Sequence, residues 1–132
     1  MLNLSHKRLD VYTMSLKLLK EVYTITKTFP KEEMYVLISQ IRRSAISVCS
    51  NIAEGASRHS KAEKRRFYEI SRSSLVEMDT QFEIALLLNY FNTGQIKELE
   101  EYLESIFRML SKMIANLADS HSTRHSPNPT NH

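Results

Sequence analysis

The chain has 132 residues, of which 42% are hydrophobic and 25% are charged, with a net charge of +3 and a single cysteine. This length fits one domain with its own core, and a single cysteine excludes an internal disulfide and a cysteine-rich zinc site. Only two glycines and three prolines are present, whereas folds built from strands and turns need many more, so the composition favours an all-α protein. We expect a cytoplasmic protein that does not enter membranes, because the N-terminus lacks an apolar stretch of signal-peptide length and no run of about 18 apolar residues occurs.

The first half of the chain predicts two helices, at about residues 7–28 and 31–56. Pro30 followed by an acidic pair is typical of a helix start, because proline suits the first helical position and acids favour the positive end of the helix dipole. Gly55 is predicted to end the second helix by taking the left-handed conformation. The predicted core stripes are Tyr12, Leu16, Leu19 and Tyr23 in the first helix and Met34, Ile38, Ile41, Ala45, Val48 and Ile52 in the second.

The second half of the chain predicts two further helices, at about residues 60–91 and 94–119. Ser60 with Glu63 three residues later is typical of a capping box at a helix start. Gly94, in an Asn-Thr-Gly break, separates the two helices. Their predicted core stripes are Phe67, Leu75, Met78, Phe82, Ala85 and Leu86 in the first and Leu99, Leu103, Ile106, Leu110, Ile114 and Leu117 in the second.

The connections between these helices are short, so neighbouring helices should run antiparallel. We therefore predict an up-down-up-down antiparallel four-helix bundle over residues 1–119. Residues 120–132 contain no aliphatic or aromatic side chain and cannot contribute to a packed core. We predict that they form a disordered C-terminal tail.

A basic cluster follows the predicted end of the second helix, and its members are Arg58, Lys61, Lys64, Arg65 and Arg66. The bundle topology places it at one end of the molecule with the bases of residues 6–8, whereas the acids of residues 98–101 lie at the other end. Such a run is usually a solvated face, and Arg65 can pair with Glu69 one turn later. Cations near a helix N-terminus oppose the helix dipole, however, and binding to phosphate groups would explain them. The cluster is therefore the candidate nucleic-acid-binding site.

Two aromatic residues adjoin the basic cluster. Phe67 falls on the predicted core stripe and is expected inside the bundle. Tyr68 falls at the border of that stripe, where an aromatic ring can either pack or stack on a base.

Residues 50–55 read SNIAEG, and a strip of small polar residues runs beside the core stripe of the same helix. This strip consists of Ser44, Ser47 and Asn51. The ordinary interpretation is a capped helix end with a hydrogen-bonded strip that lets another helix approach closely. Alternatively, Asn51 and Glu54 orient the basic cluster toward a ligand, or the strip forms a subunit contact.

The remaining polar residues of this motif lie on other sides of the same helix. Ser50 and Arg43 are predicted to face away from the core, and Arg42 is predicted to lie on a flank. Both arginines are expected to form surface or inter-subunit salt bridges, with phosphate contact as the alternative.

Apolar residues also occur outside the predicted core stripes, and these are Tyr35, Ile46, Val76, Ile84 and Leu87. A monomer would expose them as patches on two helices. Scattered apolar surface residues are normal, but rows of them favour an interface between subunits. We therefore predict that the chain associates with copies of itself.

Neither a metal site nor a catalytic motif is visible. No glutamate has a histidine three residues later, which is the spacing of di-iron centres in helical bundles. Cys49 is predicted to be a buried, inert thiol at the margin of the core. The chain contains no glycine-rich phosphate loop and no nucleophile motif, so we predict a protein that is not an enzyme and carries no cofactor or metal.

Residues 39–60 read SQIRRSAISVCSNIAEGASRHS, with FPKEE before them and SLVEMDTQFEIA after them. These stretches resemble the four-helix-bundle family of proteins encoded in intervening sequences of bacterial 23S rRNA genes. They are similar, more remotely, to the accessory proteins of diversity-generating retroelements. The resemblance covers about residues 6–92, with Cys49 where many members are expected to have proline and Tyr12 where tryptophan is expected. It implies a homopentamer, a role with nucleic acid and, for the retroelement relatives, a partner reverse transcriptase.

Two functions remain open from the sequence. The first is an oligomeric, non-catalytic protein that binds structured RNA through a ring of basic clusters. The second is a protein-interaction scaffold or accessory subunit, whose basic end docks a partner that is acidic or carries nucleic acid, such as a reverse transcriptase.

Overall fold

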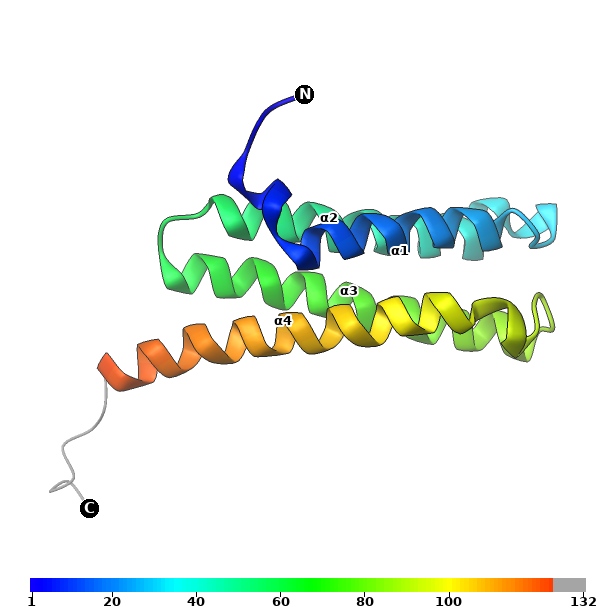
Figure 1. The fold of residues 1–132 in the computed structure, drawn as a ribbon. Helices are drawn as coiled ribbons and strands as arrows, with labels where there is room; N and C mark the ends of the chain where they lie inside the picture. The colour runs from blue at the N-terminus through cyan, green and yellow to red at the C-terminus, as the bar shows by residue number, and fades with distance from the viewer. Residues whose placement is uncertain (125–132) are drawn as a thin grey trace, which may run out of the picture.

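The fold is an antiparallel bundle of four helices (Figure 1). A computed structural model describes residues 1–124 and the side chains as far as residue 118. The helices are α1 (Asp10–Thr26), α2 (Ser39–Ser57), α3 (Lys61–Leu87) and α4 (Lys97–Arg124). They are preceded by 3-10 turns at Ser5–Arg8, Lys31–Glu33 and Thr93–Ile96 and by a π-helical turn at Met34–Ile38. The described residues contain no strand, and the predicted all-α, up-down-up-down bundle is confirmed.

The four helices close around a single core. α1 contacts α2 and α4, and α3 contacts α2 and α4, with the most extensive contact between α2 and α3. Figure 1 shows α1 and α2 as one layer and α3 and α4 as the other. No helix within residues 1–124 combines the length and the apolar character needed to cross a bilayer.

The predicted core stripe of α1 is wrong at Leu16, and its other members lie beside the centre of the core rather than in it. The buried residues of α1 are Val11, Ser15, Leu18, Val22, Ile25 and Thr26. Leu16 is exposed, and the predicted Tyr12, Leu19 and Tyr23 are half-buried at the edge of the core. Apolar residues occupy most positions of α1, so periodicity alone does not decide which of two adjacent stripes faces the core. A tyrosine hydroxyl needs water or another polar partner, which the edge of the core offers and its centre does not. The aliphatic side chains of α1 therefore face the bundle axis.

The predicted stripes of the other helices are right at most positions, with three exceptions. Met34 is exposed because the π-helical turn that contains it has more residues per turn than an α-helix and rotates it out of the stripe of α2. Leu86 is exposed on the flank of α3 beside the buried Ala85. Phe67 is half-buried, because its neighbour Tyr68 takes the buried position where α2 packs on α3.

The prediction that Gly55 takes the left-handed conformation is wrong. No described glycine has a positive φ, and α2 continues through Gly55 to Ser57. Gly55 is buried against α3, where a Cβ would lie 2.6 Å from Cε1 of Tyr68 and 3.2 Å from Cβ of Phe67. Glycine is required here because a side chain would collide with the tyrosine ring, so Gly55 sets the close approach of two helices rather than a turn.

The left-handed residue is Asn89, with a φ of 61°. Its N–H donates to the carbonyl of Leu86, and the N–H of Tyr90 donates to the carbonyl of Ala85. These two bonds form a Schellman motif, which satisfies the last carbonyls of a helix. α3 therefore ends at Leu87, before the predicted boundary at 91.

α4 continues to Arg124, so the predicted start of the tail at residue 120 is too early. Each residue added to an existing helix gains one hydrogen bond, and the first proline after Leu117 is Pro127. The rest of the predicted tail, residues 125–132, lies outside the described residues.

Aromatic rings hold together the two turns at the end of the bundle away from the α2–α3 turn. Phe29, in the α1–α2 turn, stacks on Phe91, in the α3–α4 turn, with ring centres 6.0 Å apart. Phe82 packs edge-on against both rings at 6.5 and 6.0 Å. This cluster closes the core at that end and leaves the opposite end to polar residues.

Replacing Gly55 with Ala should destabilise the protein by about 1–3 kcal/mol. Overpacking against the Tyr68 ring outweighs the roughly 1 kcal/mol that alanine gains over glycine in a helix. Gly94→Ala is the matched control, because a Cβ there meets only Oδ1 of Asn92 at an ordinary 3.4 Å. Urea unfolding followed by circular dichroism measures both variants, and equal stabilities would contradict the close contact.

Candidate nucleic-acid interface

The basic cluster lies at the end of the bundle that is formed by the α2–α3 turn. Figure 1 shows the N-terminal 3-10 turn, the start of α1 and the C-terminal part of α4 at this same end, whereas the other two turns lie at the opposite end. The 3-10 turn, which contains Lys7 and Arg8, contacts α2. We refer to the basic cluster together with Lys7 and Arg8 as the basic end.

Arg58 joins the end of α2 to α3 through two contacts. Its Nη2 donates to Oε2 of Glu54 at 2.9 Å, and its guanidinium carbon lies 4.8 Å from the centre of the Phe67 ring. Glu54 therefore positions one member of the basic cluster. Asn51 does not, because its Nδ2 donates to O and Oγ of Ser47 at 2.9 and 3.0 Å.

Lys64 caps the C-terminus of α2. Its Nζ donates to the carbonyl of Ala56 at 3.1 Å and lies 3.5 Å from the carbonyl of Gly55. The last carbonyls of a helix have no partner within it, and positive charge there favours the negative end of the dipole. Part of the charge of the basic cluster thus stabilises the bundle itself.

The other bases of the cluster lie on the first turns of α3, which begins after the N-cap Ser60. The N–H of Glu63 donates to Oγ of Ser60 at 3.1 Å, which is one of the two bonds of the predicted capping box. Arg65 lies 3.8 Å from Glu69, so the predicted pair one turn apart is present. Lys61 and Arg66 are exposed. Together with the exposed Arg8, they present positive charge to solvent.

The sequence predicts Phe67 inside the bundle and Tyr68 at the border of the core, but the structure buries Tyr68 more deeply than Phe67. Tyr68 is only 5% exposed and packs on Gly55, and burial raises the pKa of its hydroxyl. Phe67 is half-buried and lies between two guanidinium groups, those of Arg58 at 4.8 Å and Arg66 at 5.8 Å. The space that admits Tyr68 exists only because residue 55 has no side chain, which a helical wheel of α3 alone cannot show.

The small polar strip of α2 packs against α3. Its contacts are Ser44 Oγ donating to Gln81 Oε1 at 3.1 Å, Ser47 Oγ with Ser74 Oγ at 2.8 Å, and Ser71 Oγ donating to the carbonyl of Val48 at 2.9 Å. Small side chains allow the close approach of the helices, and these bonds satisfy hydroxyls that the approach removes from water. Within the chain, the strip is therefore a helix–helix interface.

Arg42 packs on α1 and forms no salt bridge within the described residues. Its Nε donates to Oγ1 of Thr26 at 3.0 Å, and its guanidinium carbon lies 4.4 Å from the centre of the Tyr23 ring. Arg43 and Ser50 are exposed on the side of α2 that faces away from the core, as predicted.

The five apolar residues that we predicted outside the core are all exposed. They are Tyr35, Ile46, Val76, Ile84 and Leu87, with exposed fractions from 43% to 92%. Exposure in one chain agrees with a place in a subunit interface, which stays a prediction.

A metal site and a reactive cysteine are both absent from the part of the chain that the structure describes. No group of three or more histidine, cysteine, aspartate or glutamate side chains there is placed to hold a metal ion. Cys49 is buried, its Sγ donates to the carbonyl of Ser15 at 3.3 Å, and burial raises the pKa of the thiol. The prediction of a buried thiol is confirmed, and the raised pKa disfavours the reactive thiolate.

Antiparallel helices, a serine-lined contact between the second and third helices, and a basic turn joining them define a small helical-bundle protein. The family model described as 23S rRNA-intervening sequence protein matches residues 7–112. The chain belongs to this family, which confirms the resemblance seen in the sequence.

The fold also occurs in a solved structure. It is the 1.70 Å crystal structure of a protein of unknown function from the S23 ribosomal protein family of Bacteroides thetaiotaomicron VPI-5482. The two superpose with a TM-score of 0.72 at 22% sequence identity, covering 79% of this chain and 97% of the other. At this identity the likeness concerns the fold alone. No curated protein matches the sequence.

Replacing Lys64 with Met should destabilise the fold by about 1 kcal/mol, because the variant keeps the apolar stem and loses the cap on α2. Arg66→Met, two residues further on and exposed, should change stability by less than about 0.5 kcal/mol. Urea unfolding compares the two variants with the wild type. A loss in Arg66→Met as large as that in Lys64→Met would contradict the capping role.

Replacing Tyr68 with Phe should make the protein more resistant to alkali. Burial raises the pKa of Tyr68 in the folded state above the ordinary 10.0, so the unfolded state releases the proton first. The stability that the neutral ring contributes is complete below pH 10 and is lost as the pH rises through the folded-state pKa. Urea unfolding at about pH 8 and pH 11 should show a smaller loss in Tyr68→Phe than in the wild type.

Tyr35→Phe is the control for this measurement, because that ring is almost fully exposed. It should follow the wild type at both pH values. If Tyr68→Phe also follows the wild type, the buried hydroxyl does not contribute to the pH dependence.

Proposed function

We propose that the protein is a non-catalytic cytoplasmic protein that binds structured RNA through its basic end. The observation that carries this proposal is the exposed positive charge at the N-terminus of α3. Lys61 lies in the first turn of α3, where a cation opposes the helix dipole, and Arg66 follows within the second turn; both side chains are exposed. A polyanion would interact favourably with this exposed positive charge.

Binding would proceed mainly through phosphates. Arginine and lysine side chains neutralise phosphate charge and release bound counterions, which gives an affinity that falls with salt. The sequence contains no recognisable base-reading motif, so recognition would follow the shape and charge of the RNA.

Association of several copies would strengthen this binding. The exposed apolar residues of α2 and α3 support self-association, and the family resemblance implies a homopentamer. If the basic ends of the copies face the same side, their fields add over one surface. The family name, which refers to 23S rRNA, agrees with an RNA ligand.

The alternative function is a scaffold or accessory subunit for an enzyme that acts on nucleic acid, such as a reverse transcriptase. The same exposed apolar rows favour it, because they offer a protein partner more surface than a solitary RNA-binding domain needs.

A titration of fluorescent, hairpin-rich RNA tests the proposal. The wild type should bind at about 50 mM salt and weaken steeply by about 200 mM, since several phosphates are neutralised together. The double variant Lys61→Glu/Arg66→Glu should weaken binding at least about tenfold and lower the slope of log affinity against log salt by about 2.

The matched control is Lys27→Glu/Lys31→Glu, which changes the net charge equally at the opposite end of the bundle. It should bind almost as the wild type does. Equal losses in the two double variants would show that only net charge matters, and no binding by the wild type at low salt would reject the RNA proposal in favour of the scaffold.

A further inference from the structure

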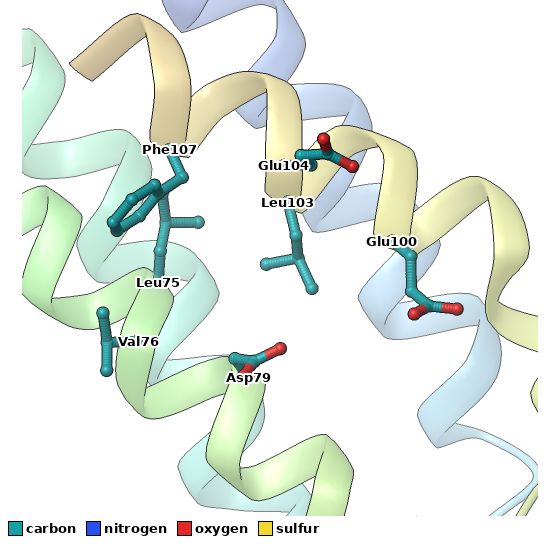
Figure 2. Close-up of a pocket in the computed structure, with 7 residues that line it drawn as sticks. All are labelled: Leu75, Val76, Asp79, Glu100, Leu103, Glu104 and Phe107. Carbon is teal, nitrogen blue, oxygen red and sulfur yellow. The ribbon is translucent and has the colours of Figure 1, made fainter. Parts of the chain in front are cut away.

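A groove with an apolar floor and an acidic rim runs between α3 and α4, and it encloses about 420 Å³ (Figure 2). Figure 2 shows Leu75 and Asp79 extending from α3 toward α4, with Val76 at the outer side of α3. The floor consists of Leu75, Val76, Leu103 and Phe107, and the rim of Asp79, Glu100 and Glu104. We call this surface the acidic groove.

Within one chain, the carboxylates of the acidic groove have few ion-pair partners and part of its apolar floor is exposed. Asp79 and Glu100 have no ion-pair partner among the described residues, and Glu104 has only an exposed contact of 3.6 Å with Arg108 on its own helix. Val76 is 53% and Phe107 42% exposed on the floor. The guanidinium carbon of Arg72 lies 5.9 Å from the centre of the Phe107 ring, and its Nη1 donates to Oγ of Ser111 at 3.2 Å. An occupant of the groove should therefore bring both an apolar side chain and positive charge.

The same chain carries a surface with these properties on its other side. It surrounds a hollow of about 420 Å³ formed by Tyr23, Met34, Tyr35, Ile38, Ser39, Arg42, Arg43 and Ile46, with two arginines and no acid. Tyr35 is 92% exposed, Ile46 is exposed beyond it, and Arg43 has no ion-pair partner among the described residues. We call this surface the arginine face.

We propose that the acidic groove receives the arginine face of a second copy of this chain. Arg43 would meet Asp79 or Glu100, and Tyr35 or Ile46 would cover the exposed floor. Of the five apolar residues predicted at the interface, Tyr35 and Ile46 belong to one surface and Val76 to the other, whereas Ile84 and Leu87 line neither.

This pairing is head-to-tail. Two acidic grooves repel each other, and so do two arginine faces, so a two-fold contact between identical surfaces is disfavoured. Each copy uses one surface toward each neighbour, and such contacts generate a closed ring or a filament. This pairing rests on the proposed self-association and identifies the two surfaces that meet. It does not depend on RNA binding.

Light scattering after size-exclusion chromatography tests the pairing. The wild type should form an oligomer. Arg43→Glu, which reverses the charge of the arginine face, and Val76→Asp, which puts a charge on the groove floor, should each lower the mass toward the 15.4 kDa of one chain. Mixed in equal amounts, the two variants should form a one-to-one pair of about twice that mass, because each retains the surface that the other lacks.

Lys17→Glu is the control, since this exposed residue of α1 lines neither surface and its replacement changes the charge as Arg43→Glu does. It should leave the mass unchanged. If circular dichroism shows that Val76→Asp is unfolded, Glu100→Lys at the exposed rim takes its place. An oligomeric wild type with unaltered variants, or variants that do not pair on mixing, would overturn the pairing alone, whereas a monomeric wild type would overturn self-association as well.

Discussion

The contact between Gly55 and the ring of Tyr68 determines the arrangement of the basic end. Because residue 55 has no side chain, α2 approaches α3 closely enough for the tyrosine ring to lie on its backbone. Tyr68 then points inward, and its neighbour Phe67 is turned outward between two arginines. The same approach brings Lys64 within reach of the last carbonyls of α2. Serines along the rest of the α2–α3 contact allow the short separation, because Ser47 and Ser74 bond to each other and Ser71 donates to the carbonyl of Val48.

Once this contact is formed, the charges of the basic cluster divide into two groups. Lys64, Arg58 and Arg65 interact with a helix terminus or with a carboxylate of their own chain. Arg66 and Lys61 are exposed near the N-terminus of α3, where an external anion would interact favourably with them. The bundle therefore separates its surfaces by role. In the proposed account, the basic end binds a polyanion, and the acidic groove and the arginine face, on the sides of the bundle, bind neighbouring copies.

Much of the fold could be predicted from the sequence, because local signals and helical periodicity agree. Pro30, the Ser60 cap and the apolar stripe of α4 each depend on residues within one helix or turn. The errors arise where a second helix decides the outcome. Gly55 was assigned to a turn because glycine is common there, whereas α3 needs the empty space beside it, and Asn89 takes the left-handed position instead. The candidate site was predicted as a group of bases. The capping role of one base and the outward position of Phe67 depend on the packing of α2 on α3, which no linear pattern contains.

Hydrogen–deuterium exchange of the protein with and without an RNA hairpin tests the central claim most directly, because it locates the bound ligand on the chain. The account predicts slower exchange at the α2–α3 turn, in residues 58–66, and at the N-terminal 3-10 turn, Ser5–Arg8, with unchanged exchange at the opposite end, in residues 27–36 and 88–96. Protection confined to that opposite end, or no protection at saturating RNA, would contradict a nucleic-acid interface at the basic end.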